Sequence, residues 1–290
     1  MIDLGTLLLD PLSHGFFVRA IAAGALVGVV CAVVGTYVVL KGLAFIGDAV
    51  SHAAFPGVVA SYLLGGPYLV GAGIAAVVTA VGIGWVSRRA RLRADTAIGV
   101  LFAGAFALGI LLFSTIRGYV GDLFSFLFGY LLAIGPGDLA ALAVLSAIVL
   151  AVVAVLWKEL LYSTFDPLGA AASGLRVEAL EYLFLALIAL TIVISLQAVG
   201  IILVVAMLVT PAATAQLLTV RFAGMMGLAI VLGVASAVIG LYVSYWLDVA
   251  SGATIVLVET SFFLVALALG PRTGWLSRRR AEAGVGPTVG

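Results

Sequence analysis

Long apolar runs separated by short polar segments dominate the chain. A helix needs about 20 mostly apolar residues to cross a bilayer. The pattern therefore predicts an all-α, polytopic helical membrane protein with eight or nine transmembrane helices. The number depends on whether the two spans on either side of Lys41 and Gly42 fuse or stay separate. The candidate spans lie near residues 16–40, 43–64, 68–86, 96–114, 138–157, 182–197, 200–219, 224–246 and 253–270.

The spans use almost the whole chain, so residues 1–290 are predicted to form a single transmembrane domain. An N-terminal segment, 1–15, precedes the first span, and a cytoplasmic tail, 272–290, follows the last. The apolar piece Leu123–Ile134 is too short to span easily and predicts an interfacial or re-entrant helix.

Composition supports the membrane assignment. Hydrophobic residues make up 64% of the chain and charged residues 9%, whereas soluble domains have roughly a quarter charged. Such a chain cannot build a fully polar surface, so lipid must surround much of it. The single cysteine, Cys31, excludes a disulfide within the chain and a multi-cysteine metal site.

Missing motifs exclude several activities. A Walker A loop needs Gly-Lys-Ser/Thr, but the two lysines, Lys41 and Lys158, follow Leu40 and Trp157. The chain also lacks the His-Glu-x-x-His and Gly-x-Ser-x-Gly patterns of hydrolases. These absences disfavour ATP binding through a Walker A loop and activity as a membrane hydrolase, and we expect no nucleic-acid partner.

Basic residues predict the orientation, because cytoplasmic loops carry an excess of Lys and Arg. The strongest cluster lies at 88–93, with four arginines. Lys158 and Arg176 bracket a second basic loop, and Arg221 marks a third. The arginines at 272–280 place the C-terminus in the cytoplasm as well.

Asp48 and His52 are the clearest candidates for metal chemistry. They are four residues apart, so they share one face of a helix. A carboxylate and an imidazole suit a divalent first-row metal ion such as manganese, iron or zinc. Two ligands do not complete a site, but two copies meeting on a two-fold axis would supply four. The alternative is a structural Asp–His hydrogen bond within the bundle.

The segment Phe165, Asp166, Pro167 and Leu168 is the second candidate. Asp suits a helix N-cap and Pro the first helical turn, so a short helix is predicted to start at Pro167 and end near Gly174. Such a helix between cytoplasmic charges is typical of a docking element for a soluble partner. An ordinary connecting helix is the alternative.

Small polar residues in the spans are weaker candidates. Thr210 and Thr214 flank Pro211 and share a helix face, and with Ser51 they are predicted to line a pathway. Helix packing through small residues is the alternative. Glu259 lies inside the last apolar run, and the pattern assigns it no role beyond a polar neighbour or snorkelling.

The run 47–57, GDAVSHAAFPG, resembles the GDxxSHAxxPG signature of the metal-ion permeases of ABC importers. The resemblance continues in Phe165-Asp166-Pro167, in 204–215 and in 251–257, in the family's order, and covers roughly residues 12–271. The chain departs from the family at Ala250, where proline is frequent, and Glu259 is not typical.

The resemblance implies a permease of the cytoplasmic membrane that imports Mn²⁺, Zn²⁺ or Fe²⁺. It implies three kinds of partner: an ATP-binding ABC subunit in two copies, an extracytoplasmic metal-binding protein and a second copy of this chain. It also implies that Asp48 and His52 meet the transported ion and that the loop containing Phe165–Leu168 docks on the ATPase. No permanently bound cofactor is expected.

An ion-coupled secondary carrier, complete in one chain, is the alternative function. Such carriers usually need several ionisable groups within the membrane. This chain offers only Asp48, His52 and Glu259, which favours the importer. The pattern leaves manganese, zinc and iron open as the transported ion.

Overall fold

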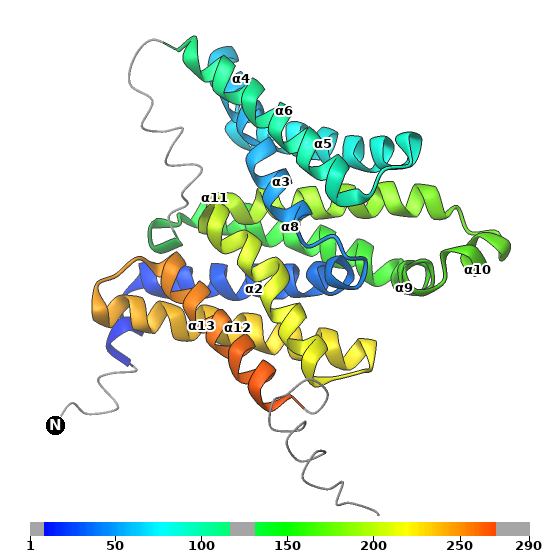
Figure 1. Ribbon diagram of the computed structural model, residues 1–290. Helices are drawn as coiled ribbons and strands as arrows, with labels where there is room; N and C mark the ends of the chain where they lie inside the picture. Colours follow the sequence, from blue (N-terminus) through cyan, green and yellow to red (C-terminus); the bar gives the residue numbers. More distant parts are fainter. Residues whose placement is uncertain (1–8, 117–130, 271–290) are drawn as a thin grey trace, which may run out of the picture.

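The computed structural model describes residues 9–116 and 131–270, and this part of the chain is helical without strands. Figure 1 shows the helices as a bundle from which α9 and α10 extend at one end. The long helices are α2 (Gly15–Leu40), α5 (Tyr68–Ala90), α6 (Ala94–Ser114), α8 (Pro136–Val155), α11 (Val177–Leu218), α12 (Phe222–Leu247) and α13 (Ser251–Leu269). The short helices are α3 (Ile46–Ala53), α4 (Phe55–Leu64), α9 (Trp157–Phe165) and α10 (Pro167–Ala172), with a 3₁₀ turn at Leu131–Ala133.

Seven helices in the described ranges are long and apolar enough to cross a membrane, so the prediction of eight or nine spans is not confirmed. The predicted span 43–64 is divided between α3 and α4, each too short to cross alone. Two other predicted spans, 182–197 and 200–219, both lie in the 42-residue α11.

Gly200 breaks α11 into two halves. Its φ of 78° and ψ of 171° are not helical, and glycine reaches this region without the steric penalty of a Cβ. Figure 1 shows the chain changing direction within α11, so that its second half runs back across the bundle. The break coincides with the boundary that the sequence predicted between its two apolar runs.

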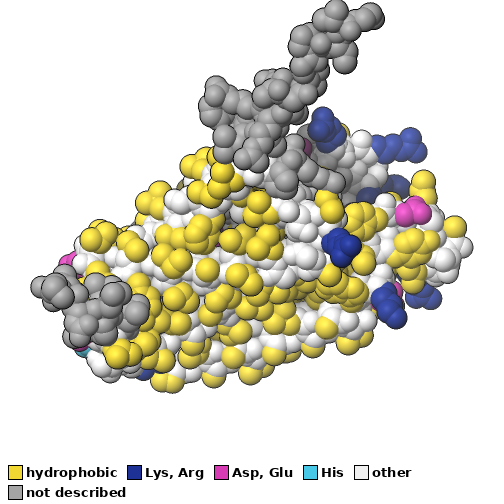
Figure 2. Space-filling view, turned by 90° about the horizontal axis from the view of Figure 1, so that it is seen from below, with side chains coloured by type: hydrophobic (Ala, Val, Ile, Leu, Met, Phe, Trp, Pro, Cys, Tyr) yellow, Lys and Arg dark blue, Asp and Glu magenta, His cyan; other side chains and the backbone are white. Residues whose placement is uncertain are grey.

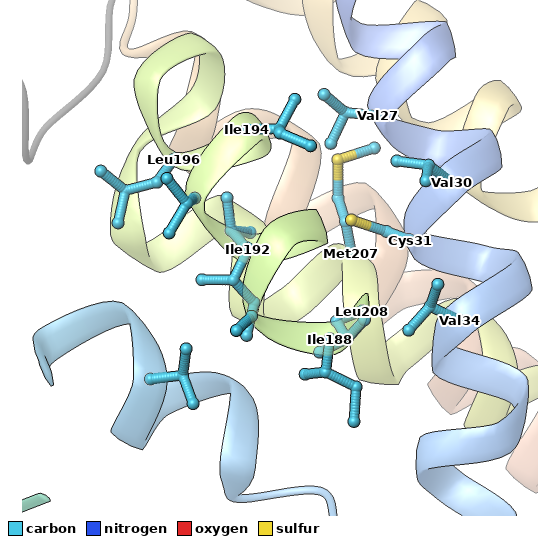
Figure 3. Close-up of a cluster of buried hydrophobic side chains, with 14 of the residues drawn as sticks. Val27, Val30, Cys31, Val34, Ile188, Ile192, Ile194, Leu196, Met207 and Leu208 are labelled. Atoms are coloured by element: carbon cyan, nitrogen blue, oxygen red, sulfur yellow. The ribbon is translucent and has the colours of Figure 1, made fainter. Parts of the chain in front are cut away.

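The core lies where α2 packs against α11 and α12. Small residues allow this packing, since a Cβ on Gly35 would lie 1.8 Å from the carbonyl oxygen of Leu208. Branched and sulfur-containing side chains fill the space between α2 and α11 (Figure 3). The buried members include Val27, Val30, Cys31 and Val34 of α2, and Ile188, Ile192, Met207 and Leu208 of α11.

Three basic segments gather at one end of the molecule, here named the basic end: 88–93, 157–176 and 219–222. Arg88 pairs with Glu181 near the start of α11, the helix that follows the second segment. The ring of Phe165 lies 6.3 Å from that of Phe222, which joins the second to the third. Figure 2 shows Lys and Arg side chains concentrated towards this end, beside a largely hydrophobic flank.

This distribution fits a bundle that spans the membrane with its basic end in the cytoplasm. Lys41, at the end of α2, lies at the same end: burial lowers the pKa of its ammonium group, and the nearby charge of Arg88 lowers it further. The predicted cytoplasmic tail, 272–290, lies outside the described residues. So does most of Leu123–Ile134, which is described only from Leu131 onward.

Candidate metal site

The helix α3 carries the candidate ligands on its open face. Its other face is buried, and a Cβ on Gly47 would lie 3.1 Å from the Leu208 side chain of α11. Packing against α5, α6 and α11 fixes the helix in place. Asp48 and His52 lie on the open face and remain partly exposed, with His52 beside α6, so α3 presents them together as the sequence spacing predicted.

The two candidate ligand atoms lie close together. Oδ1 of Asp48 lies 3.5 Å from Nε2 of His52. This is longer than an ordinary N–H···O hydrogen bond, which reaches about 3.2 Å. Two ligand atoms each ~2.1 Å from a tetrahedral ion lie about 3.4 Å apart. The separation is compatible with a pair of metal ligands, and the assignment of the pair as the ion site stays a prediction.

Aromatic contacts orient the imidazole. The His52 ring lies 5.5 Å from Phe102 and 5.3 Å from Phe106, both on α6, in edge-to-face arrangements. The two phenylalanine rings stack on one another at 6.0 Å. Because these rings occupy one side of the imidazole, Nε2 is left facing Asp48.

The pair does not complete a coordination shell by itself. Among residues 9–116 and 131–270, no group of three or more His, Cys, Asp or Glu side chains comes close enough to hold an ion. The side chains of Asp48 and His52 are 51% and 30% exposed, so further ligands have access from outside the protomer.

The candidate pathway residues lie on neighbouring helices, α3 and the second half of α11. Ser51 is fully buried, and its hydroxyl donates to the Gly47 carbonyl at 2.8 Å. Thr214 is also buried and donates to the carbonyl of Thr210 at 2.7 Å. Both hydroxyls thus bond to their own helix, and a role for these three residues along a pathway stays a prediction.

The short helix predicted after Phe165 is confirmed as α10. Oδ1 of Asp166 accepts a hydrogen bond from the backbone N–H of Gly169 at 2.8 Å, as an N-cap does. Pro167 is the first helical residue, and Gly174 follows the helix with a φ of 90°. Phe165 and Leu168 are 63% and 83% exposed, so the element presents two large apolar side chains outward.

Glu259 has a polar neighbour, one of the two possibilities that the sequence left open, although the sequence did not identify it. The side chain is buried, and Oε1 accepts a hydrogen bond from Ser236 Oγ at 3.2 Å, which joins α13 to α12. Its other oxygen has no hydrogen-bond partner among the residues that the structure describes. A lone carboxyl in an apolar run carries no sequence signal that names its partner.

A family model described as the ABC 3 transport family matches residues 13–270. The chain belongs to the ABC 3 transport family. Among relatives, it is 46% identical over 267 residues to the "Manganese transport system membrane protein MntC" of Halalkalibacterium halodurans, covering 92% of this chain and 91% of the relative. It is 41% identical to a "Probable iron transport system membrane protein" of Haemophilus influenzae, covering 90% and 96%.

The solved structure "PsaBC from Streptococcus pneumoniae in complex with Fab" is similar to this ABC 3 chain with a TM-score of 0.82 and 36% identity. The match covers 93% of this chain and 98% of the other. The predicted resemblance to permeases of metal-ion ABC importers is therefore confirmed. With its apolar helices, this ABC 3 family member is a multi-pass protein of the cytoplasmic membrane.

Proposed function

We propose that the chain is the membrane-spanning permease subunit of an ATP-driven importer that moves a divalent metal ion, Mn²⁺, Zn²⁺ or Fe²⁺, across the cytoplasmic membrane. The observation that carries the proposal is the ligand pair on α3, with 3.5 Å between Asp48 Oδ1 and His52 Nε2. The manganese and iron systems named among the relatives support it.

Two copies of the chain form the pathway. One protomer offers a carboxylate and an imidazole, and a second copy related by a two-fold axis would double this set. Such a shell is weak enough to release its ion, which a transport site must do. Mn²⁺ and Fe²⁺ accept carboxylate and imidazole donors, so the set fits the ions named among the relatives.

A separate ATPase supplies the energy, because the chain has no Walker A lysine. Two copies of this subunit would dock at the basic end, where the α9–α10 element presents Phe165 and Leu168. An extracytoplasmic metal-binding protein would deliver the ion at the opposite end. The permease itself holds no permanent cofactor.

The test is Mn²⁺ uptake into proteoliposomes that contain the chain and its co-expressed ATPase. Uptake should require ATP, and Asp48→Asn and His52→Gln should each reduce it strongly while the complex still assembles. Thr260→Ala, an exposed change on α13, is the matched control and should leave uptake unchanged. ATP-independent uptake by the chain alone would favour a secondary carrier and contradict the proposal.

A further inference from the structure

The α9–α10 element follows α8 with only Leu156 between them, and a short link at residues 173–176 leads from it to α11. The two helices pack on one another and make only slight contact with α8 and α11. Figure 1 shows them extending beyond the end of the bundle. Besides these chain connections, large side chains packed as a bridge between the element and the bundle offer a second route by which a displacement of the element reaches the bundle.

Aromatic rings form that bridge, with Phe222 at its centre. Phe222 is the first residue of α12, and its ring centroid lies 6.3 Å from Phe165, 5.1 Å from Trp157 and 5.0 Å from Tyr37. These separations are those of rings in direct contact. Phe165 and Trp157 are the last and first residues of α9, so Phe222 contacts both ends of that helix.

Tyr37 continues the bridge into the bundle. It is fully buried near the end of α2, and its ring lies 5.7 Å from Phe184 of α11. Its hydroxyl has no hydrogen-bond partner among the described residues, so packing within the hydrophobic core holds the side chain. We name Tyr37, Trp157, Phe165 and Phe222 the aromatic joint.

The end of α2 leads directly to the ligand helix. Lys41 caps α2, Gly42 turns the chain with a φ of 68°, and α3 begins at Ile46. Asp48 is therefore eleven residues after Tyr37, across one tight turn. A shift of the α2 end would therefore act on α3 through the short connection at residues 41–45.

We propose that the aromatic joint transmits movement of the α9–α10 element to α3, with Phe222 as its central positioning residue. This inference rests on the proposed function, because it takes α9–α10 as the ATPase-docking element. Close-packed interiors transmit strain rather than absorb it. Phe222 acts through Tyr37 and Trp157 and does not touch the ion.

The experiment measures Mn²⁺ transported per ATP hydrolysed by the reconstituted permease–ATPase complex. In Phe222→Ala, all three ring contacts are lost, and we expect the ratio to fall about tenfold, within the range that changes along coupled networks produce. Phe222→Tyr keeps the ring and should restore the ratio. Where the alanine variant does not assemble, Phe222→Leu removes the ring at similar volume and should show the same direction of change.

Phe17→Ala is the matched control. Phe17 is equally an aromatic residue packed between rings, 5.2 Å from both Tyr242 and Tyr245, but it lies at the opposite end of α2. Loss of this ring should lower the amount of folded complex and leave the transport ratio unchanged. A role in stability alone would make Phe222→Ala behave in the same way.

The outcomes separate this inference from the proposed function. A wild-type complex without ATP-dependent Mn²⁺ uptake would contradict the proposed function itself. An active wild type with a Phe222→Ala ratio within about twofold of normal would contradict only the role of the aromatic joint. An equal fall in the ratio for Phe17→Ala would also overturn it.

Discussion

Gly35→Ala should disturb both stability and the candidate site. A Cβ on Gly35 would lie 1.8 Å from the carbonyl oxygen of Leu208, whereas real Cβ contacts hardly ever fall below 3.0 Å. The helices α2 and α11 would have to separate by more than about 1 Å, and overpacking of this kind typically costs about 1–3 kcal/mol. Because the obstacle is backbone that cannot rotate away, we expect at least about 3 kcal/mol.

The displacement would reach the ligands through Leu208, whose side chain packs against Gly47 of α3. We expect Gly35→Ala to lower the thermal unfolding midpoint in detergent and to reduce Mn²⁺ uptake per folded complex. Gly104→Ala is the control, since a Cβ on Gly104 meets nothing within 4 Å. If both variants unfolded at the same temperature, the close approach of α2 and α11 would be wrong.

Three further predictions test other parts of the structure. Asp166→Ala should cost about 1 kcal/mol of local helix stability through loss of the N-cap and weaken ATPase binding in a pull-down, whereas Asp166→Asn should retain it. Glu259→Gln keeps an acceptor for Ser236 and should preserve the unfolding midpoint, whereas Glu259→Leu should lower it. A cysteine at Arg89, which is exposed at the basic end, should react with an impermeant thiol reagent only from the cytoplasmic side; Cys31 is buried and gives little background.

Local features were predictable from sequence because their causes lie within a few residues. The Asp166 cap depends on Pro167 and Gly169 nearby, and the shared face of Asp48 and His52 follows from helical spacing alone. The break between α3 and α4 was missed, although Pro56, at the start of α4, was the available signal. The prediction of one span at residues 43–64 followed the length of the apolar run and did not take account of that proline.

Contacts between distant segments could not be predicted in this way. Tyr37, Trp157 and Phe222 belong to three separate segments, and each one alone looks like an ordinary apolar residue of a span or its edge. The bond from Ser236 to Glu259 likewise depends on how α12 meets α13. In so apolar a chain, hydrophobic periodicity does not distinguish the face that meets another helix from the face that meets lipid.

The most direct test of the central claim is pulsed electron paramagnetic resonance (electron spin-echo envelope modulation) of Mn²⁺ bound to the purified, tag-free complex. Hyperfine coupling to an imidazole nitrogen should be present in the wild type and absent in His52→Gln. The other histidine of the chain, His14, is the N-cap of α2 and is distant from His52 in the sequence, so His14→Gln should keep the coupling. Nitrogen coupling that persisted in His52→Gln, or was absent from a transport-competent wild type, would contradict the assignment of Asp48 and His52 as the site that meets the ion.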